Sequence, residues 1–348
     1  MRIPRRTILL GAGLLAAGVA RAQTAPGDSA ALQQLHAAAK KEGQLTWYSG
    51  ILDQPICDRI GQAFTTRYPG IHVNAIKTTS QVAFQRLLQD LKAGVPQSDV
   101  LTTTDASHMS YLSGKGLLVQ YRPENEAGMV KALQRFDPDG YYVVSWVGLV
   151  AIVYNSGKVT AADSPKDWPD LADPKWKGRI ALGSPSFSGM VGVWTVAMEG
   201  NYGWDYFEKL NKLNPLIGRS IDDSITVLNS GERLVAASNP ASALRSAAKG
   251  NPLAVNYPTS GTLAVMSPSG IIKGTRSPNA AKLFMEFLCG PEYSAILAEG
   301  FDQPLRPDVT PPKGAKSLAD FKFFTPALAK IEKELPPNKE KWRDTFGG

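Results

Sequence analysis

A single apolar run, residues 141–154, limits the fold more than any other feature of the chain. Tyr, Val, Trp, Leu, Ile and Ala make up the run, and only Ser145 and Gly148 break its apolar character. Strands in globular proteins are usually about 5–6 residues long, so the run is too long for one ordinary strand. We therefore predict a strand that leaves one lobe of the protein and continues into a second lobe.

A second crossing between lobes is predicted in residues 253–266, where Pro258 and Gly261 interrupt an extended pattern. Elsewhere, short apolar runs suited to strands alternate with helical patterns. Such alternation is typical of a parallel, doubly wound sheet. The predicted fold class is therefore α/β, with two doubly wound lobes joined by hinge strands.

Individual elements are predicted from apolar spacing and from the residues that start and stop helices. The first helix covers residues 29–41 and ends at Gly43, and the first strand covers residues 45–48. Further helices are expected from Asp53, from a Ser80 cap, from Val191 and from a Ser277 cap, with strands over residues 71–76, 100–103, 180–182 and 234–237.

The N-terminal segment has the features of an export signal. Arg2, Arg5 and Arg6 precede an uncharged run, and Ala20-Arg21-Ala22 has the small-x-small form that signal peptidase cuts. We expect residues 1–22 to be removed after Ala22 and the product to reach the periplasm. The Arg5-Arg6 pair resembles a twin-arginine signal, and general secretory export stays open as the alternative.

Charge and length exclude several classes of protein. Residues 1–22 contain four arginines and no acid, which leaves 34 basic against 31 acidic side chains, a formal charge of +3. A nucleic-acid binder needs a clustered basic face, so we predict no nucleic-acid partner. After the signal, no apolar run reaches about 18 residues, and we predict no membrane span. The remaining length suits about two domains.

Cysteine and histidine are too sparse to predict a metal site or a cofactor. Cys57 and Cys289 could form a disulfide in an oxidising compartment, or remain two buried thiols; the sequence leaves both possibilities open. The histidines, at positions 36, 72 and 108, are far apart in sequence and are expected at the surface or in the core. We predict that no cofactor is bound.

Several motifs in a fixed order resemble a known family. They are residues 37–43 running into 45–50, Ser98-Asp99-Val100 with Thr104-Asp105, residues 152–156, and Trp168 with residues 173–180. Together they resemble the periplasmic solute-binding proteins of ATP-driven importers, in the branch that includes ferric-ion and phosphorylated-solute binders. The resemblance extends over residues 29–310.

The resemblance implies two α/β lobes, each discontinuous in sequence, that close on a ligand like a hinge. The expected first lobe combines residues 29–144 with 262–303, and the second combines 145–261 with 304–348. The implied partners are a small-molecule ligand and the membrane permease of an ABC transporter, and we expect a monomer. An exported receptor that passes its ligand to a sensor is an alternative.

Three polar loops are candidates for holding a ligand, because each follows a predicted strand. In open α/β sheets, ligands bind beyond the carboxyl ends of the strands, where helix N-termini favour anions. An ordinary capped turn is the alternative interpretation of each loop. The candidate residues are Ser49 and Gly50; Thr103, Thr104 and Asp105; and Ser184, Ser186, Ser188 and Gly189.

Three further candidates lie near the predicted crossings. Trp146 on the first crossing and Tyr257 beside the second could cover a ligand, or could simply belong to the core. Asn239 follows a predicted strand and could supply an amide contact. Asp105 could pair with a basic side chain, or favour a cationic group of the ligand.

The positions of the tyrosines bear on the chemical class of the ligand. Ferric binders of the resembled family use neighbouring tyrosines in the second lobe, whereas residues 236–241 contain none. The only adjacent pair, Tyr141-Tyr142, lies on a strand, where successive side chains face opposite ways. We therefore predict a small organic anion such as a phosphate ester, phosphonate or carboxylate, with a ferric ion as the alternative.

An enzyme is the competing class, and the sequence argues against it. A hydrolase of the α/β type would need G-x-S-x-G, and a P-loop would need G-x-x-x-x-G-K-[ST]; neither pattern occurs. A secreted hydrolase stays as a weaker alternative. The predicted mechanism is capture by closure, with no chemistry performed on the ligand.

Overall fold

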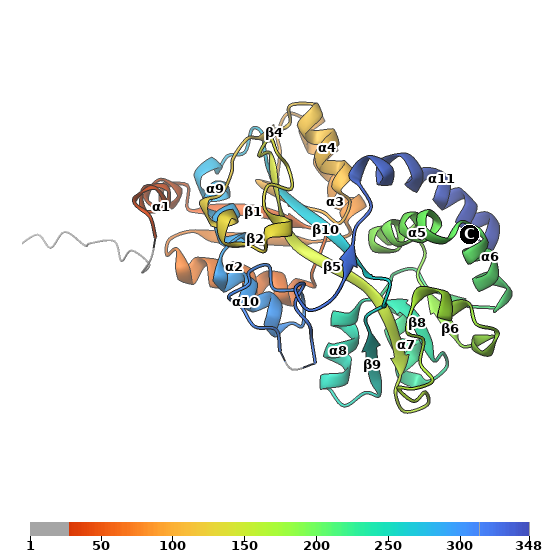
Figure 1. Ribbon diagram of the computed structural model, residues 1–348. Coiled ribbons are helices and arrows are strands. Elements are labelled where there is room, and N and C mark those ends of the chain that lie inside the picture. Colours follow the sequence, from red (N-terminus) through yellow and green to blue (C-terminus); the bar gives the residue numbers. More distant parts are fainter. Residues whose placement is uncertain (1–27, 313, 348) are drawn as a thin grey trace, which may run out of the picture.

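The computed structural model of the protein describes residues 28–312 and 314–347 (Figure 1). The predicted signal over residues 1–22 lies outside the described residues. The helices are α1 (Ala30–Glu42), α2 (Gln54–Arg67), α3 (Ser80–Lys92), α4 (Ala106–Gly114), α5 (Gly189–Tyr202), α6 (Asp205–Lys212), α7 (Asp223–Ser230), α8 (Pro240–Ala248), α9 (Pro278–Leu288), α10 (Pro291–Glu299) and α11 (Leu328–Phe346).

The strands alternate with these helices along the chain. They are β1 (Gln44–Ser49), β2 (His72–Lys77), β3 (Val100–Thr102), β4 (Leu118–Val119), β5 (Tyr142–Asn155), β6 (Ile180–Leu182), β7 (Leu216–Ile217), β8 (Val235–Ser238), β9 (Leu253–Asn256), β10 (Thr262–Ile272) and β11 (Phe323–Phe324).

Strand β5 connects two sheets. Its first part, up to Val150, pairs antiparallel with β10, and its second part, from Ala151, pairs with β8 and β9. The whole strand of 14 residues is buried. The predicted long crossing strand is therefore confirmed, and its uninterrupted apolar character follows from packing in one sheet and then in the other (Figure 1).

Both sheets are built around parallel strands, as the alternation predicted. The first runs in the order β2-β1-β3-β10-β5, with β1 parallel to β2 and to β3. The second runs β5-β8-β6-β7, with β6 parallel to β8 and to β7. The chain crosses back between β9 and β10, at the predicted second crossing. The fold class, two α/β lobes joined by hinge strands, is confirmed.

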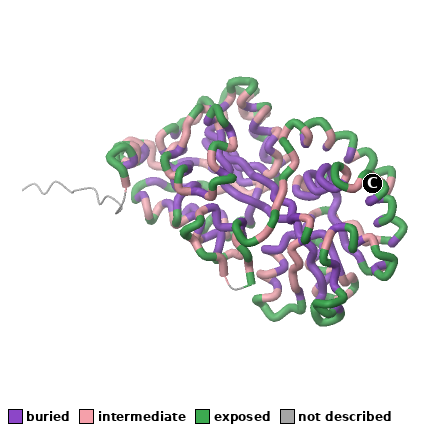
Figure 2. Tube along the Cα trace, in the orientation of Figure 1, coloured by how far each residue is buried: buried purple, intermediate pink, exposed green. Residues whose placement is uncertain are grey.

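An aromatic cluster fills the core on each side. In the first lobe, the ring of Phe284 lies 5.3 Å from those of Trp47 and Phe64. In the second, the ring of Phe207 lies 5.5 Å from Trp194 and 5.6 Å from Trp342. Figure 2 shows the buried residues concentrated along the strands and the helix faces that cover them.

Helix α11 returns from the C-terminal region across the second lobe. It packs against α5 and α6, and its contacts also reach α4 of the first lobe. Leu335 and Trp342 are buried on this helix, and Pro336 and Pro337 lie inside it. The helix thus contacts helices on both sides of the hinge strands.

The helix boundaries agree with the sequence predictions at most ends. Ser29 caps α1 by accepting from the Leu32 amide, and Gly43 ends it with φ of 75°, a left-handed conformation suited to glycine. Two predicted caps differ. Thr79, not Ser80, caps α3, and the Ser277 side chain makes no capping bond to α9.

Within the described residues, Cys57 and Cys289 are both free and buried. Burial raises the pKa of each thiol, so neither is poised as a thiolate. Over the same residues, no helix combines the length and the apolar character that crossing a bilayer requires.

Candidate functional site

A polar cleft of about 670 Å³ lies between the two sheets. The first lobe lines it with the loops that follow β1, β2 and β3, and the second lobe lines it with the segments that begin α5, α7 and α8. These loops leave the carboxyl ends of parallel strands, which is where open α/β sheets bind ligands.

Several helices begin at the cleft wall. Thr79 and Ser80 at the start of α3, and Ser188 and Gly189 at the start of α5, all line it. The first amides of a helix have no partner within the helix and carry partial positive charge. The Ser188 side chain accepts from the Val191 amide at 3.5 Å, so it fixes the first turn of α5. Such a wall favours the oxygens of an anion.

Six of the residues singled out from the sequence line this cleft. They come from five segments of both lobes and the hinge strand, so the fold brings together positions far apart in the chain. The six are Gly50, Thr104, Trp146, Ser188, Gly189 and Asn239.

The other six lie elsewhere. Ser49 and Thr103 are buried; Ser49 Oγ accepts from the Cys57 thiol at 3.4 Å, and Thr103 Oγ1 is hydrogen-bonded to His108 Nδ1 at 2.9 Å. Asp105 lines a separate cavity. The remaining three are also outside the cleft lining: Ser184, Ser186 and Tyr257.

Ser184 and Tyr257 make contacts within the protein and do not face the cleft. The Ser184 carbonyl accepts from the amides of Phe187 and Ser188, at 3.2 and 3.0 Å, so this residue shapes the loop rather than opening to the cleft. The Tyr257 ring packs on Phe321 with ring centroids 4.8 Å apart. Ser186 is exposed on the loop.

Ser80 connects the loops of the first lobe. Its Oγ donates to the Gly50 carbonyl at 3.2 Å and accepts from the Thr104 amide at 2.9 Å. A Cβ on Gly50 would lie 2.8 Å from the Ser80 Cα, so only glycine permits this approach. The sequence pattern predicts Ser80 only as a helix cap and gives no sign of this connection.

The two lobes meet at Thr104 and Gly189. A Cβ on Gly189 would lie 2.7 Å from Thr104 Oγ1, so a side chain there would push against the facing loop. Thr104 Oγ1 is itself hydrogen-bonded to Ser80 Oγ at 2.9 Å. The contact therefore links the start of α5 to the network of the first lobe.

The hinge side of the cleft holds an ion pair between the partly exposed Arg245 and the buried Asp302. Arg245 on α8 donates to Asp302 at 2.9 Å and to the Gly300 carbonyl at 2.6 Å. Trp146 Nε1 donates to the same carboxylate at 3.1 Å. Burial raises the pKa of Asp302 to about 6, against the opposing effect of the Arg245 charge. Neither Arg245 nor Asp302 stands in a sequence pattern that predicts a site residue.

Four further charged side chains line the cleft. Lys77 and Lys249 are basic, and Asp53 and Asp222 are acidic. Asp53 precedes α2 without making a capping bond. Asp222 is an exposed residue that lines the cleft. The cleft can therefore satisfy a ligand of mixed polarity.

Metal ligands are sparse here. No tyrosine or histidine lines the cleft among the described residues. Within the same part of the chain, no group of three or more His, Cys, Asp and Glu side chains is arranged to hold a metal ion. The polar groups that line the cleft are instead hydroxyls, amides, ammonium and guanidinium groups, which can donate hydrogen bonds, and carboxylates, which accept them.

Two α/β lobes around a polar cleft define the class of periplasmic binding proteins with the type 2 fold. This chain belongs to the family of bacterial extracellular solute-binding proteins, whose model matches residues 96–334. The family resemblance seen in the sequence is confirmed.

Solved structures and a curated relative agree with this class. Iron-bound HitA from Pseudomonas aeruginosa superposes with a TM-score of 0.74 at 22% identity, over 86% of this chain and 98% of that chain. AfuA from Actinobacillus pleuropneumoniae, with fructose-6-phosphate bound, gives 0.75 at 22% identity, over 87% and 98%. Iron uptake protein A1 of Synechocystis sp. is 27% identical, covering 80% of this chain and 82% of that protein.

Proposed function

We propose that the protein captures a small organic anion in the periplasm and delivers it to the permease of an ABC transporter. The ligand class is a phosphate ester, phosphonate or carboxylate. One observation carries the proposal: the interlobe cleft combines the N-terminal ends of α3 and α5 with the basic side chains of Lys77, Arg245 and Lys249. Oriented amides and cations together are the usual recognition elements for anionic oxygens.

The acidic residues of the cleft shape this proposal. Asp302 is engaged by Arg245 and Trp146, so it offers little free charge to a ligand. Asp53 and Asp222 remain, and they suit hydroxyl or amine groups on the body of the solute. The favoured ligand therefore has one anionic group and further hydrogen-bond donors.

Closure of the two lobes is the proposed mechanism. A ligand that contacts loops of both lobes has more contacts in the closed form, so it shifts the population toward closure. The expected lobe boundaries, 29–144 with 262–303 and 145–261 with 304–348, are kept as the proposed moving bodies. The change of sheet within β5 and the β9–β10 connection supply two hinge segments.

The remaining roles follow from the same proposal. The protein acts as a monomer, performs no reaction on its ligand and binds no nucleic acid. Its partners are the small solute and the membrane permease. Its place is the periplasm, after removal of residues 1–22.

A ferric ion is the second candidate, because Iron uptake protein A1 and iron-bound HitA carry iron in their names. The lining of the cleft argues against it, since phenolate and imidazole ligands are missing from the described lining residues. The two candidates make opposite predictions for the same titration.

Isothermal titration with organic phosphates, phosphonates, carboxylates and ferric citrate tests the proposal. We expect binding of an organic anion, and a loss of roughly 10–100-fold in affinity for Arg245→Met or Lys77→Met, since hydrogen bonds to charged groups contribute about 1.5–3 kcal/mol. Lys333→Met, on the exposed face of α11, is the matched control and should bind like wild type. Tight ferric binding with no response to organic anions would replace this proposal by the ferric one.

A further inference from the structure

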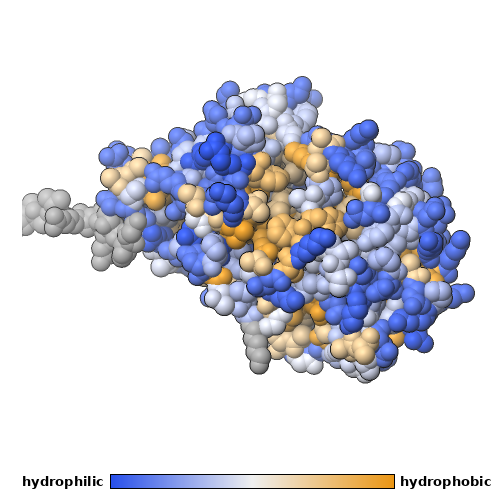
Figure 3. Space-filling model, in the orientation of Figure 1, coloured by the Kyte–Doolittle hydropathy of each residue, from blue (hydrophilic) through white to orange (hydrophobic). Residues whose placement is uncertain are grey.

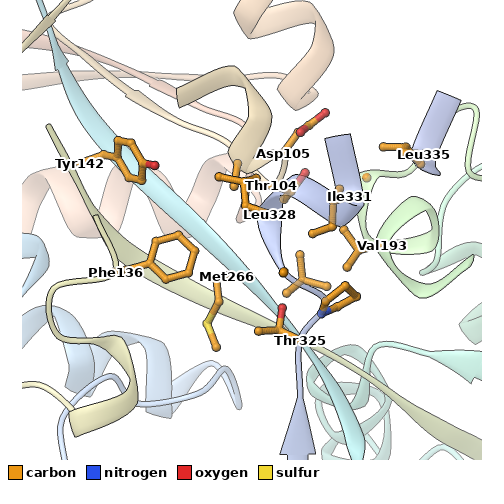
Figure 4. Close-up of a pocket in the computed structure, with 15 residues that line it drawn as sticks. Thr104, Asp105, Phe136, Tyr142, Val193, Met266, Thr325, Leu328, Ile331 and Leu335 are labelled. Carbon is orange, nitrogen blue, oxygen red and sulfur yellow. The ribbon is translucent and has the colours of Figure 1, made fainter. Parts of the chain in front are cut away.

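A second cavity, of about 370 Å³, adjoins the polar cleft (Figure 4). Thr104 and Gly189 line both this cavity and the cleft. Elements of both lobes, the hinge strand β10 and the start of α11 form its walls. Figure 3 shows apolar residues gathered in a hollow at the centre of this face, over β5 and β10.

The walls of this second cavity are mostly apolar. Phe136 and Tyr142 stand on one side, with ring centroids 6.4 Å apart, and Met266 lies near them in Figure 4. Val193 of α5 and Ile331 of α11 face them from the other side. Small-molecule pockets usually measure about 300–1,000 Å³, so the cavity is large enough for a compact organic molecule.

Asp105 is the one charged side chain in the described lining of this cavity, and it lies at the upper rim in Figure 4. It is the N-cap of α4, where Oδ1 accepts from the Ser107 amide at 3.0 Å. Oδ2 lies 3.6 Å from His108 Nε2, beyond hydrogen-bond distance, and the side chain is only 12% exposed. A carboxylate in an apolar setting is costly unless it is paired.

The neighbouring histidine does not supply the missing positive charge. His108 is stacked on Phe84 with a centroid distance of 3.9 Å. Desolvation is the largest influence on its imidazole and lowers the pKa below the usual value; the Asp105 carboxylate opposes this effect, and nearby Lys339 adds to it. The ring is therefore neutral near pH 7 and supplies no positive charge beside the Asp105 carboxylate.

More negative charge surrounds the aromatic wall. Burial raises the pKa of the Tyr142 hydroxyl, and the carboxylates of Asp137, Glu332 and Asp139 raise it further. Aromatic faces attract cations by about 0.5–2 kcal/mol, so the rings of Phe136 and Tyr142 suit a cation as well as an apolar group.

We propose that this cavity is a second binding site, which takes a small organic cation with an aromatic or branched apolar body. The apolar body lies against Phe136 and Tyr142, and the ammonium group lies at the Asp105 rim. The proposal rests on the second cavity alone and does not depend on what the polar cleft binds. Because α4, α5 and α11 all contribute to the walls, an occupant touches both lobes.

Isothermal titration of the purified full chain with three matched probes tests this site. The probes are 2-phenylethylamine, neutral 2-phenylethanol and anionic 3-phenylpropanoate. We expect the amine to bind at least ten-fold more tightly than the alcohol, and the anion more weakly than either. Equal affinity of the amine and the alcohol overturns the proposal of a cation site.

Asp105→Asn removes the charge and keeps a side chain that caps helices well. It should weaken amine binding at least ten-fold and leave the alcohol unchanged. Lys339→Met removes a nearby positive charge and should strengthen amine binding two- to five-fold. An unchanged amine affinity in Asp105→Asn contradicts the assignment of the carboxylate.

Two further variants locate the site. Leu328→Trp fills the cavity from the partly exposed start of α11 and should abolish binding of both the amine and the alcohol, with folding checked by thermal melting. Gln81→Trp, which fills the polar cleft from a partly exposed position, should leave amine binding unchanged. Loss of amine binding in Gln81→Trp, with Leu328→Trp unaffected, places the amine in the cleft and overturns the proposal.

Discussion

The polar cleft and the apolar cavity share one wall, formed by Thr104 and Gly189. The carboxylates that line them, Asp302 in the cleft and Asp105 in the cavity, have different hydrogen-bond partners. In the cleft, Asp302 is held by Arg245 and by Trp146. In the cavity, Asp105 has only the amide and hydroxyl of Ser107 at one oxygen. A carboxylate that is satisfied internally supports structure, whereas one with an open oxygen is available to a ligand.

Asp302 is paired but also desolvated by burial, and this desolvation should show itself in the pH dependence of stability. The pKa of Asp302 is about 6, above the value of about 3.9 for an unfolded aspartate. The folded state therefore prefers the protonated form, and the associated stability is complete below about pH 4 and is lost as the pH rises through 6. The shift of about two pKa units corresponds to up to about 3 kcal/mol.

Urea unfolding of wild type and Asp302→Asn between pH 4 and pH 7 measures this effect. The neutral asparagine should remove that pH-dependent loss, so the two profiles converge at low pH and separate at neutral pH. If the stabilities of the two proteins change with pH in parallel, Arg245 compensates the charge of Asp302 fully. Asp302 and Asp105 would then differ even more in how well their charges are compensated.

The shared wall allows both cavities to be disturbed with one substitution. Gly189→Val places methyl groups against Thr104, and overpacking of this kind costs about 1–3 kcal/mol. We expect roughly 5–150-fold weaker binding at both sites. Titration of an organic anion and of the amine measures the two losses.

Thr104→Ala in the same chain is the matched control, because it removes the hydroxyl that the new side chain meets. The double variant should recover part of the binding at both sites. If Gly189→Val weakens only one site, the two cavities are not coupled through this wall.

Two serines of one loop give the smallest expected effects. Ser188→Ala removes the cap of α5 and should cost about 1 kcal/mol of stability, with weaker binding in the cleft. Ser186→Ala, at an exposed position, should stay within about 0.5 kcal/mol of wild type and bind normally. Thermal melting and anion titration of the pair check this; equal losses would extend the cleft to Ser186.

The sequence predicted the architecture because apolar patterning reports burial directly. Residues 141–154 are apolar throughout because β5 is buried along both sheets. Loop positions were predicted as well, since Gly50, Thr104 and Gly189 each follow or precede a recognisable strand or helix. At these positions the sequence pattern predicts a loop beside a strand or helix, and the fold places the loop there.

What the sequence could not predict depends on contacts between distant segments. Nothing near Asp302 in the sequence indicates that it pairs with Arg245, because the ion pair joins residues brought together only by the fold. The pattern also fails to separate Ser184 from Ser188. Both are loop serines, but the Ser184 carbonyl accepts from the loop amides while Ser188 faces the cleft.

Helix α11 has a consequence for the mechanical cycle of the protein. It packs on α5 and α6 and also reaches α4, so a rotation that spreads the lobes must slide this helix over at least one neighbour. Such shear between packed helices proceeds in discrete steps. A permease that separates the lobes would then have to break contacts of α11. Shortening the helix from its C-terminal end should therefore make release of the ligand faster.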